Sequence, residues 1–117
     1  MTKSKELEQY MSNFYGTEKY YETPYGFVLT DGAKAFALKA EAYWFITLVG
    51  SIFITKHKNF VDDLVSIKLV VKKQAAYVEF TNSDKTFYTQ DIPFTDCPAG
   101  EWLFFLTGGA LMWHGEY

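Results

Sequence analysis

The sequence predicts an α+β domain with two layers. An antiparallel β-meander of about five strands packs against one long buried helix, and a further helix stands at the N-terminus. Three observations predict this arrangement: helical spacing of apolar residues near the N-terminus, a long apolar stretch over residues 33–54, and five β-prone segments separated by turn residues over 64–113. Because the helical segments precede the strands, we expect separate helix and sheet layers.

Length and composition favour a single cytoplasmic domain. At 117 residues the chain has the size of one domain, so we expect residues 1–117 to share one core. The formal charge of -3 lacks the broad basic surface of nucleic-acid-binding proteins, so no nucleic-acid partner is expected. A single cysteine, Cys97, excludes an intramolecular disulfide, and residues 1–9 lack the apolar segment of a signal peptide.

The first predicted helix begins near Ser4, whose side chain can cap it. Its apolar residues follow the spacing of one helical face: Leu7, Tyr10, Met11 and Phe14. Gly16 then ends the helix. The next two β-prone runs, 19–22 and 27–30, surround a turn signal at Pro24 and Gly26 and predict a small hairpin.

The main helix is predicted to begin after the loop Thr30-Asp31-Gly32 and to continue through Ile54. Residues 42–54 are apolar nearly all round, which indicates a helix buried on several sides or one with a face left for a partner. A homodimer through that face is therefore one alternative. Lys39 and Glu41 interrupt the apolar run, which is then shorter than the roughly twenty residues of a membrane span. No membrane association is expected.

The C-terminal half is predicted to be β-structure, because β-branched and aromatic residues dominate it. Turn chemistry separates the segments at 72–75, at 82–84 and at Gly108-Gly109, where glycine permits a positive φ. Alternation places Val78 and Glu79 on opposite faces of a sheet that is wet on one side. The predicted strands are Leu64–Val71, Tyr77–Phe80, Phe87–Ile92, Trp102–Leu106 and Leu111–Trp113.

No cofactor or metal is expected. His57 and His114 stand alone, whereas a metal site needs three or four ligands that converge. Cys97 follows the acidic Asp96, which disfavours a reactive thiolate, so we interpret it as a small buried hydrophobe. The sequence contains none of the glycine-rich motifs that bind phosphate and no nucleophile elbow.

Two alternative sites follow from the remaining polar and aromatic residues. Loop carboxylates could act as acid and base in one pocket, although aspartates commonly accept backbone hydrogen bonds in turns. The candidates for that pocket are Asp31, Asp96, His114 and Glu116. The N-terminal third is rich in tyrosine, a residue favoured at protein interfaces. The candidates for protein contact are Tyr15, Tyr20, Tyr21 and Tyr25.

Five short motifs, in this order, resemble an uncharacterised family of small bacterial single-domain proteins found on phages and plasmids. The motifs are Phe14-Tyr15-Gly16-Thr17, Thr30-Asp31-Gly32, Ala42-Tyr43-Trp44, Ile92-Pro93-Phe94-Thr95-Asp96 and Glu116-Tyr117. The sequence departs from the family pattern at Cys97, where phenylalanine is usual, and at Gly115, where serine is usual. The resemblance implies a mobile-element setting and a partner among host proteins, for example a defence complex such as CRISPR.

The leading hypothesis is therefore a non-enzymatic domain that binds a host protein or a second copy of itself. The missing catalytic motifs and the tyrosine-rich N-terminal third support it. The alternative is a small-ligand-binding protein or an enzyme that uses the loop carboxylates.

Overall fold

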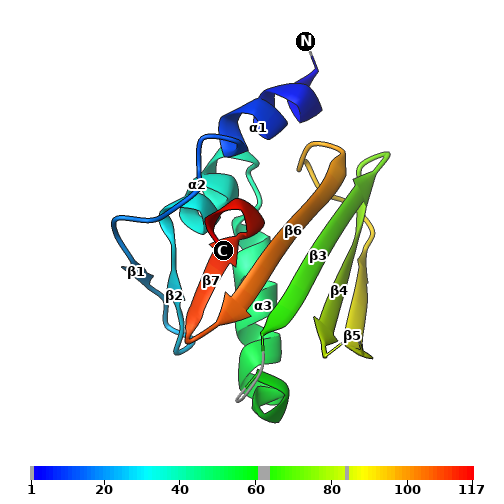
Figure 1. Cartoon of the computed structure of the whole chain (residues 1–117). Helices are drawn as coiled ribbons and strands as arrows, with labels where there is room; N and C mark the ends of the chain where they lie inside the picture. The colour runs from blue at the N-terminus through cyan, green and yellow to red at the C-terminus, as the bar shows by residue number, and fades with distance from the viewer. Residues whose placement is uncertain (1, 61–63, 84) are drawn as a thin grey trace.

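A computed structural model describes residues 2–60, 64–83 and 85–117, and it confirms the mixed α+β class. In this part of the chain, three α-helices accompany a seven-stranded sheet (Figure 1). The helices are α1 (Lys3–Met11), α2 (Asp31–Lys39) and α3 (Tyr43–Thr55). The strands are β1 (Tyr21–Glu22), β2 (Val28–Leu29), β3 (Val65–Lys72), β4 (Ala75–Asn82), β5 (Lys85–Ile92), β6 (Gly100–Thr107) and β7 (Ala110–Trp113). Short 3-10 helices cover His57–Phe60 and His114–Glu116.

The sheet is not the simple meander that the sequence predicted. Its order is β1-β2-β7-β6-β3-β4-β5, so β6 lies beside β3 rather than beside β5. The burial pattern explains the order. Strand β3 has a fully buried face and suits the centre of the sheet, whereas β5 has no fully buried residue and carries polar residues such as Thr89 and Asp91, which suit an edge.

The sheet has two strands more than the five predicted, and these two strands, β1 and β2, form the N-terminal hairpin. The hairpin between β1 and β2 is confirmed, but it also joins the main sheet, because β2 runs parallel to β7. Val28 donates its N–H to the carbonyl of Gly109 at 2.9 Å, and Thr30 donates to that of Leu111 at 3.1 Å. This parallel contact links segments about eighty residues apart, which local sequence patterns cannot reveal.

The prediction of one long helix is wrong, because the chain breaks between α2 and α3. Glu41 has a φ of 53°, in the left-handed region. The N–H of Ala42 bonds the carbonyl of Ala37 at 2.9 Å, and the N–H of Glu41 bonds that of Leu38 at 3.3 Å. These two bonds form the Schellman arrangement that ends many helices. Glycine usually occupies the left-handed position, so a glutamate there gave no signal in the sequence.

One face of the sheet packs against α2 and α3 and forms the core. Phe36 of α2 lies at the centre of the aromatic part of the core. Its ring centroid is 4.9 Å from that of Phe104 and 5.7 Å from that of Trp102. The predicted dry and wet faces of the sheet are confirmed: Val78 is fully buried, while Glu79 is only half-buried on the other face. The core thus fixes α2 relative to the sheet.

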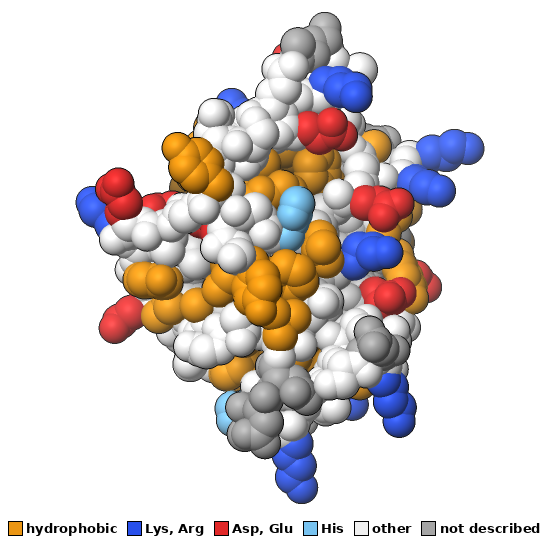
Figure 2. All heavy atoms as spheres, viewed as in Figure 1, with side chains coloured by type: hydrophobic (Ala, Val, Ile, Leu, Met, Phe, Trp, Pro, Cys, Tyr) orange, Lys and Arg blue, Asp and Glu red, His pale blue; other side chains and the backbone are white. Residues whose placement is uncertain are grey.

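The opposite face of the sheet, which we call the open sheet face, also carries apolar side chains. Figure 2, viewed as Figure 1, shows hydrophobic side chains gathered in the middle of this side of the molecule. Tyr117 is 74% exposed, and its ring centroid lies 5.1 Å from that of Phe105. Lys68 and Glu101 form an ion pair of 3.9 Å on the same face. The apolar residues of the open sheet face include Leu103, Phe105, Met112 and Tyr117.

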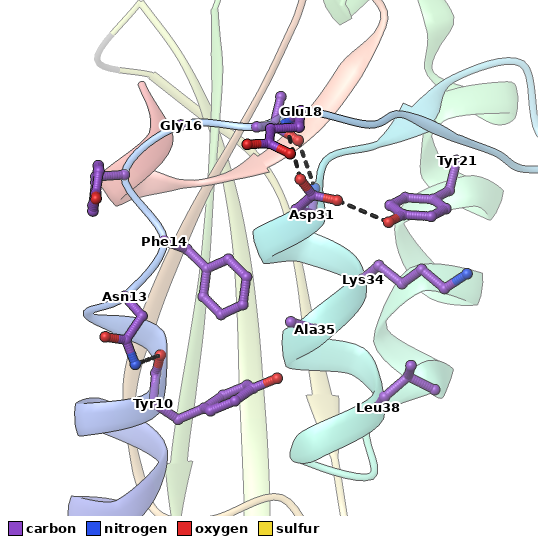
Figure 3. Close-up of a pocket in the computed structure, with 12 residues that line it drawn as sticks. Tyr10, Asn13, Phe14, Gly16, Glu18, Tyr21, Asp31, Lys34, Ala35 and Leu38 are labelled. Atoms are coloured by element: carbon purple, nitrogen blue, oxygen red, sulfur yellow. Dashed lines mark hydrogen bonds between the residues drawn. The ribbon is translucent and has the colours of Figure 1, made fainter.

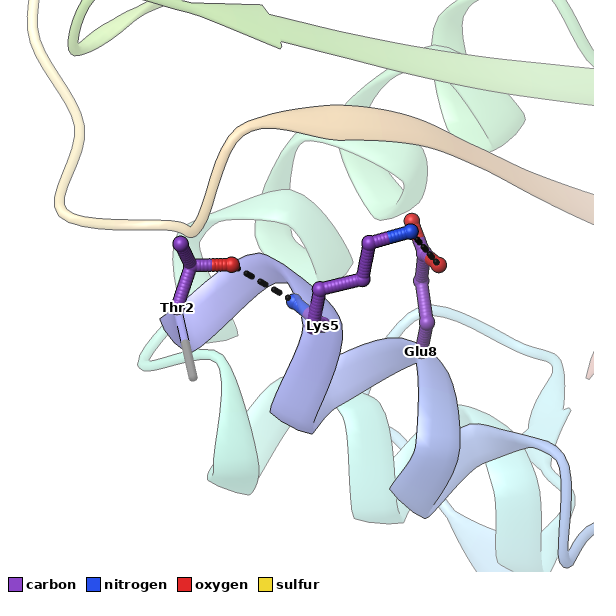
Figure 4. A network of polar contacts seen from close by, with 3 residues as sticks. All are labelled: Thr2, Lys5 and Glu8. Atoms are coloured by element: carbon purple, nitrogen blue, oxygen red, sulfur yellow. Dashed lines mark hydrogen bonds and ion pairs between the residues drawn. The ribbon is translucent and has the colours of Figure 1, made fainter.

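Helix α1 begins earlier than the sequence predicted. Thr2, rather than Ser4, is the N-cap, because its hydroxyl accepts the N–H of Lys5 at 3.2 Å. Lys5 also forms an ion pair with Glu8 at 3.8 Å (Figure 4). The buried residues of α1 are Leu7 and Met11. The helix ends at Met11, so the predicted apolar Phe14 lies in the loop that follows it.

The predicted hairpin turns at 72–75 and 108–109 are confirmed. Lys73 and Gln74 have φ values of 48° and 64°, and Gly108 and Gly109 have values of 58° and 76°. Consecutive positive φ angles are typical of the tight turns that match strand twist. In the third predicted turn, Asp84 lies outside the described residues.

Helix α3 buries most of its apolar surface. Among its residues, Tyr43 and Ile54 are more than half exposed, and they lie at opposite ends of the helix. Trp44, Leu48 and Phe53 are half-buried, and a dimer through this helix stays a prediction. No helix within the described ranges is long and apolar enough to cross a membrane.

Candidate binding site

A pocket of about 680 Å³ lies where α1 and the loop after it meet α2 (Figure 3). One wall comes from the end of α1 and the loop through residue 18. The other wall comes from the exposed side of α2. The lining residues are Tyr10, Asn13, Phe14, Tyr15, Gly16, Thr17, Glu18, Tyr21, Asp31, Lys34, Ala35 and Leu38.

Asp31, the first residue of α2, holds the loop that forms one wall of this pocket. Its carboxylate accepts the backbone N–H of Glu18 at 2.9 Å and of Lys19 at 3.4 Å. It also accepts the hydroxyl of Tyr21 at 2.8 Å. These donors, the Glu18 N–H first, lower the pKa of Asp31 below its ordinary value. Asp31 therefore remains ionised and is well suited to position the loop, but poorly suited to donate a proton.

Thr17 makes the contact between this loop and α2 reciprocal. Its hydroxyl oxygen accepts the backbone N–H of Asp31 at 2.8 Å, while the hydroxyl donates to the carbonyl of Lys19 at 2.8 Å. The loop thus caps α2, and Asp31 binds the loop in return. This explains why the Gly16-Thr17 and Asp31 motifs, well separated in sequence, act as one structural unit.

Tyr21 connects Asp31 to the one lysine in the pocket lining. Its hydroxyl is held by Asp31, and that hydrogen bond is the main reason why the pKa of Tyr21 is raised above its ordinary value. The ammonium of Lys34 lies over the Tyr21 ring, 4.1 Å from the centroid. Lys39, on the same helix, lies 5.2 Å from the centroid of the Tyr10 ring. Two lysines of α2 therefore use tyrosine rings as partners.

Glu116 holds the other side of the N-terminus of α2. Its carboxylate accepts the hydroxyl of Thr30 at 2.7 Å, the N–H of Gly32 at 2.9 Å and the N–H of Trp113 at 2.9 Å. Gly32 leaves space for it, because a Cβ atom at this position would lie 2.4 Å from a Glu116 oxygen. The Thr30-Asp31-Gly32 and Glu116-Tyr117 motifs therefore meet in space.

The four tyrosines predicted to contact a partner have two different environments. Tyr15 and Tyr20 are 83% and 60% exposed. Tyr21 is half-buried beside Asp31. Tyr25 is also half-buried and lies against Gly50 of α3, where a Cβ atom would come within 2.4 Å of its ring. Tyr15 and Tyr21 line the pocket.

The predicted acid–base pocket is only partly assembled. Asp31 and Glu116 both bind the first turn of α2, but each carboxylate is occupied by three donors. Asp96 is exposed in the loop before β6, and His114 is exposed with its ring 4.4 Å from the Trp113 ring. In the described part of the chain, no hydrogen bond or ion pair joins these four side chains to one another. Their cooperation stays a prediction.

Several pocket residues were not identified from the sequence. Lys34 and Leu38 were not singled out, because nothing local distinguishes them from other surface residues, and Thr17 was noted only as part of the Phe14-Tyr15-Gly16-Thr17 motif. The useful signal was spacing along α2, since Asp31, Lys34 and Leu38 follow the three- and four-residue intervals of one helical face. Once Asp31 is assigned to the pocket, the helical spacing places Lys34, one turn later on α2, next to it.

A second group of motif residues meets at the start of α3. The indole N–H of Trp44 donates to the hydroxyl of Thr95 at 3.1 Å, and the N–H of Cys97 donates to the same oxygen at 3.1 Å. Burial raises the pKa of Cys97 to about 12, which agrees with its interpretation as a small buried hydrophobe. Within the described ranges, no group of three or more acidic, histidine or cysteine side chains could hold a metal ion.

Comparison with known proteins gives one match. The model of a protein family, described as "Family of unknown function (DUF6876)", matches residues 5–117. No curated protein and no solved structure matches the chain. The match covers all five motifs of the predicted resemblance.

Proposed function

Because this chain belongs to the DUF6876 family, whose function is unknown, we propose its function from the pocket: it is a non-enzymatic domain that binds another protein there. The observation that carries the proposal is that the pocket walls are themselves exposed, Tyr15 by 83% and Leu38 by 63%. Sites for small ligands enclose most of the ligand surface. An open pocket of this size needs a larger partner to cover its walls.

The exposed tyrosines support a protein partner. Tyr15 of the pocket lining and Tyr20, which follows it in the chain, are both exposed, and tyrosine gains contact area on binding while losing little conformational entropy. Tyr21 and Tyr25 contribute differently, because their contacts with Asp31 and Gly50 fix the segment that presents Tyr20. A fixed segment lowers the ordering cost of association.

The hydrogen bonds of the carboxylates favour this proposal over acid–base chemistry. A general acid or base needs a free position for the substrate proton. In Asp31 and Glu116 the oxygens are bound by backbone and hydroxyl donors that hold the fold. An enzyme that used Asp31 or Glu116 as its acid or base would therefore have to break the contacts that build its own site.

The mobile-element setting implied by the five motifs makes a host protein the proposed partner. A component of a host defence complex is one such target, which a small domain can block by covering a surface. This part of the proposal depends on the resemblance rather than on the pocket.

Site-specific photo-crosslinking tests the proposal. A benzophenone amino acid is placed at Tyr15 or Tyr20 in the full chain, and at Thr89 on exposed strand β5 as the matched control. After irradiation in host cells, we expect an adduct with one defined protein from positions 15 and 20 but not from 89. The partner is then purified, and its affinity is measured by calorimetry.

Alanine substitutions give the quantitative part of this test. Tyr15→Ala combined with Tyr20→Ala should weaken the purified complex at least tenfold, as expected for interface anchors. Thr89→Ala should leave the affinity unchanged. The proposal fails if no adduct forms at either tyrosine, or if the double variant binds the partner as well as the natural chain does.

A second copy of the chain is the alternative partner, and the open sheet face favours it. Its apolar residues lie beside Lys68 and Glu101, whose opposite charges could pair across a two-fold axis. Light scattering at micromolar concentration should then give a dimer, and Met112→Lys should give a monomer. A monomeric natural chain would exclude this alternative.

A further inference from the structure

We propose that the pocket accepts a partner segment in which a carboxylate side chain lies next to an apolar one. The carboxylate would meet Lys34, and the apolar side chain would cover Leu38. This inference depends on the proposed protein-binding function, because it specifies the chemistry of the protein segment that the pocket would bind.

Lys34 is available to a carboxylate. No acidic side chain among residues 2–60, 64–83 and 85–117 forms an ion pair with it, and its ammonium lies over the face of the Tyr21 ring, 4.1 Å from the centroid. A ring face satisfies an ammonium less well than a carboxylate, whose hydrogen bonds are charge-assisted. The lysine can therefore gain a stronger partner while keeping its place over the ring.

Asp31 lines the same pocket but does not compete for Lys34. Figure 3 shows its carboxylate directed to the loop at Glu18 and to the Tyr21 hydroxyl. These neutral donors stabilise the ionised carboxylate, which keeps its negative charge and is directed to the loop rather than to Lys34. By holding the hydroxyl, Asp31 also fixes the ring on which Lys34 rests, so the ammonium is kept beside the pocket.

The two lysines of α2, rather than the lining as a whole, favour an acidic segment, because the lining also carries the carboxylates of Glu18 and Asp31. Lys39 follows Lys34 by five residues, a rise of about 7.5 Å along the helix, and its ammonium lies 5.2 Å from the centroid of the Tyr10 ring. The negative side chain of Glu18 lies at the other end of the pocket, near Asp31 (Figure 3). A carboxylate is therefore attracted to the α2 edge rather than to the loop.

The wall beside Lys34 is apolar. Ala35 and the half-buried Phe14 line the pocket together with Leu38, which is 63% exposed. Leu38 lies one helical turn after Lys34, so one partner side chain can contact the ammonium while its neighbour covers the leucine. Inorganic phosphate or a free carboxylate would leave this apolar surface in water.

Titration of the full-length, ¹⁵N-labelled protein with three synthetic peptides tests the inference. The probe, acetyl-Ser-Glu-Leu-Glu-Leu-Ser-amide, carries glutamate next to leucine. One control replaces both glutamates with lysine, and the other replaces both leucines with serine. We expect the probe alone to shift the amide signals of Gly16, Lys34 and Leu38. Equal shifts with either control peptide, or with inorganic phosphate, would overturn the inference.

Matched charge reversals complete the test. Lys34→Glu should weaken probe binding about tenfold or more, whereas Lys72→Glu, the same change on β3, should leave it unchanged. Equal effects of the two variants, or no shifts at all, would overturn the inference. If crosslinking at positions 15 and 20 identifies a partner whose contacting segment is basic, the protein-binding function stands and only this inference fails.

Discussion

The carboxylate of Glu116 accepts the backbone N–H of Gly32 at 2.9 Å and so joins the C-terminal segment to the first turn of α2. A helix N-terminus has unpaired N–H groups and a partial positive charge, and a carboxylate satisfies both. The same group binds Thr30 and Trp113. The wall of the proposed binding pocket is therefore supported by a residue near the other end of the chain.

Glu116→Ala and Gly32→Ala should each destabilise the fold by about 1–3 kcal/mol, the first by leaving three donors unpaired and the second by crowding the carboxylate. Because both changes disrupt one contact, the double variant should lose less than the sum of the two single losses. Urea unfolding measures all three values. Strictly additive losses would show that the two residues act independently.

Acid should destabilise the protein partly through Asp31. Its pKa is lower in the folded state, so its stabilising effect is present above the unfolded pKa of about 3.9 and is lost as the pH falls through the folded value. Asp31→Asn should therefore flatten the dependence of unfolding free energy on pH below about 5. Asp91→Asn, on the exposed edge strand, is the control. An unchanged slope in Asp31→Asn would contradict the assignment.

Thr95→Val should destabilise the junction between α3 and the loop before β6 by about 1–3 kcal/mol, because two donors, Trp44 and the N–H of Cys97, lose their acceptor. Thr95→Ser keeps the hydroxyl and should lose much less. Thermal unfolding followed by circular dichroism compares the two. Equal losses would mean that the methyl group contributes as much to stability as the hydroxyl does.

The thiol of Cys97 should be inert in the native protein. A pKa of about 12 lowers the thiolate fraction at pH 8 by roughly a thousandfold relative to a free cysteine. Reaction with Ellman's reagent should therefore be slow until guanidinium unfolds the chain. Rapid labelling under native conditions would show that the residue is reactive.

The sequence predicted the parts of the fold that depend on local patterns. Strand alternation, the turn at Gly108 and Gly109 and the hairpin between β1 and β2 all follow from neighbouring residues. The pairing of β2 with β7 and of β6 with β3 joins segments that are far apart in the sequence. Local sequence patterns therefore could not predict either pairing. The sequence did not indicate the break between α2 and α3, because Glu41 has a left-handed φ there, and that conformation is usual for glycine and not for glutamate.

The candidate site was predictable in its polar residues but not in its shape. Asp31 and Tyr15 were singled out by residue type, which indicates capping or contact chemistry. Lys34 matters only because Tyr21 lies beneath it, and that neighbour comes from strand β1 rather than from α2. Such a pair becomes visible only once the hairpin and α2 are placed.

The parallel pairing of β2 with β7 has a consequence for the order of synthesis. Residues 65–92 can pair into a local three-stranded sheet while the chain is still being made. Strand β2, by contrast, can pair with the sheet only after Ala110 and Leu111 have been synthesised. In a chain that ends before residue 110, the hairpin of β1 and β2 would have no strand to pair with, and quality-control proteases would meet an exposed segment rather than a finished surface.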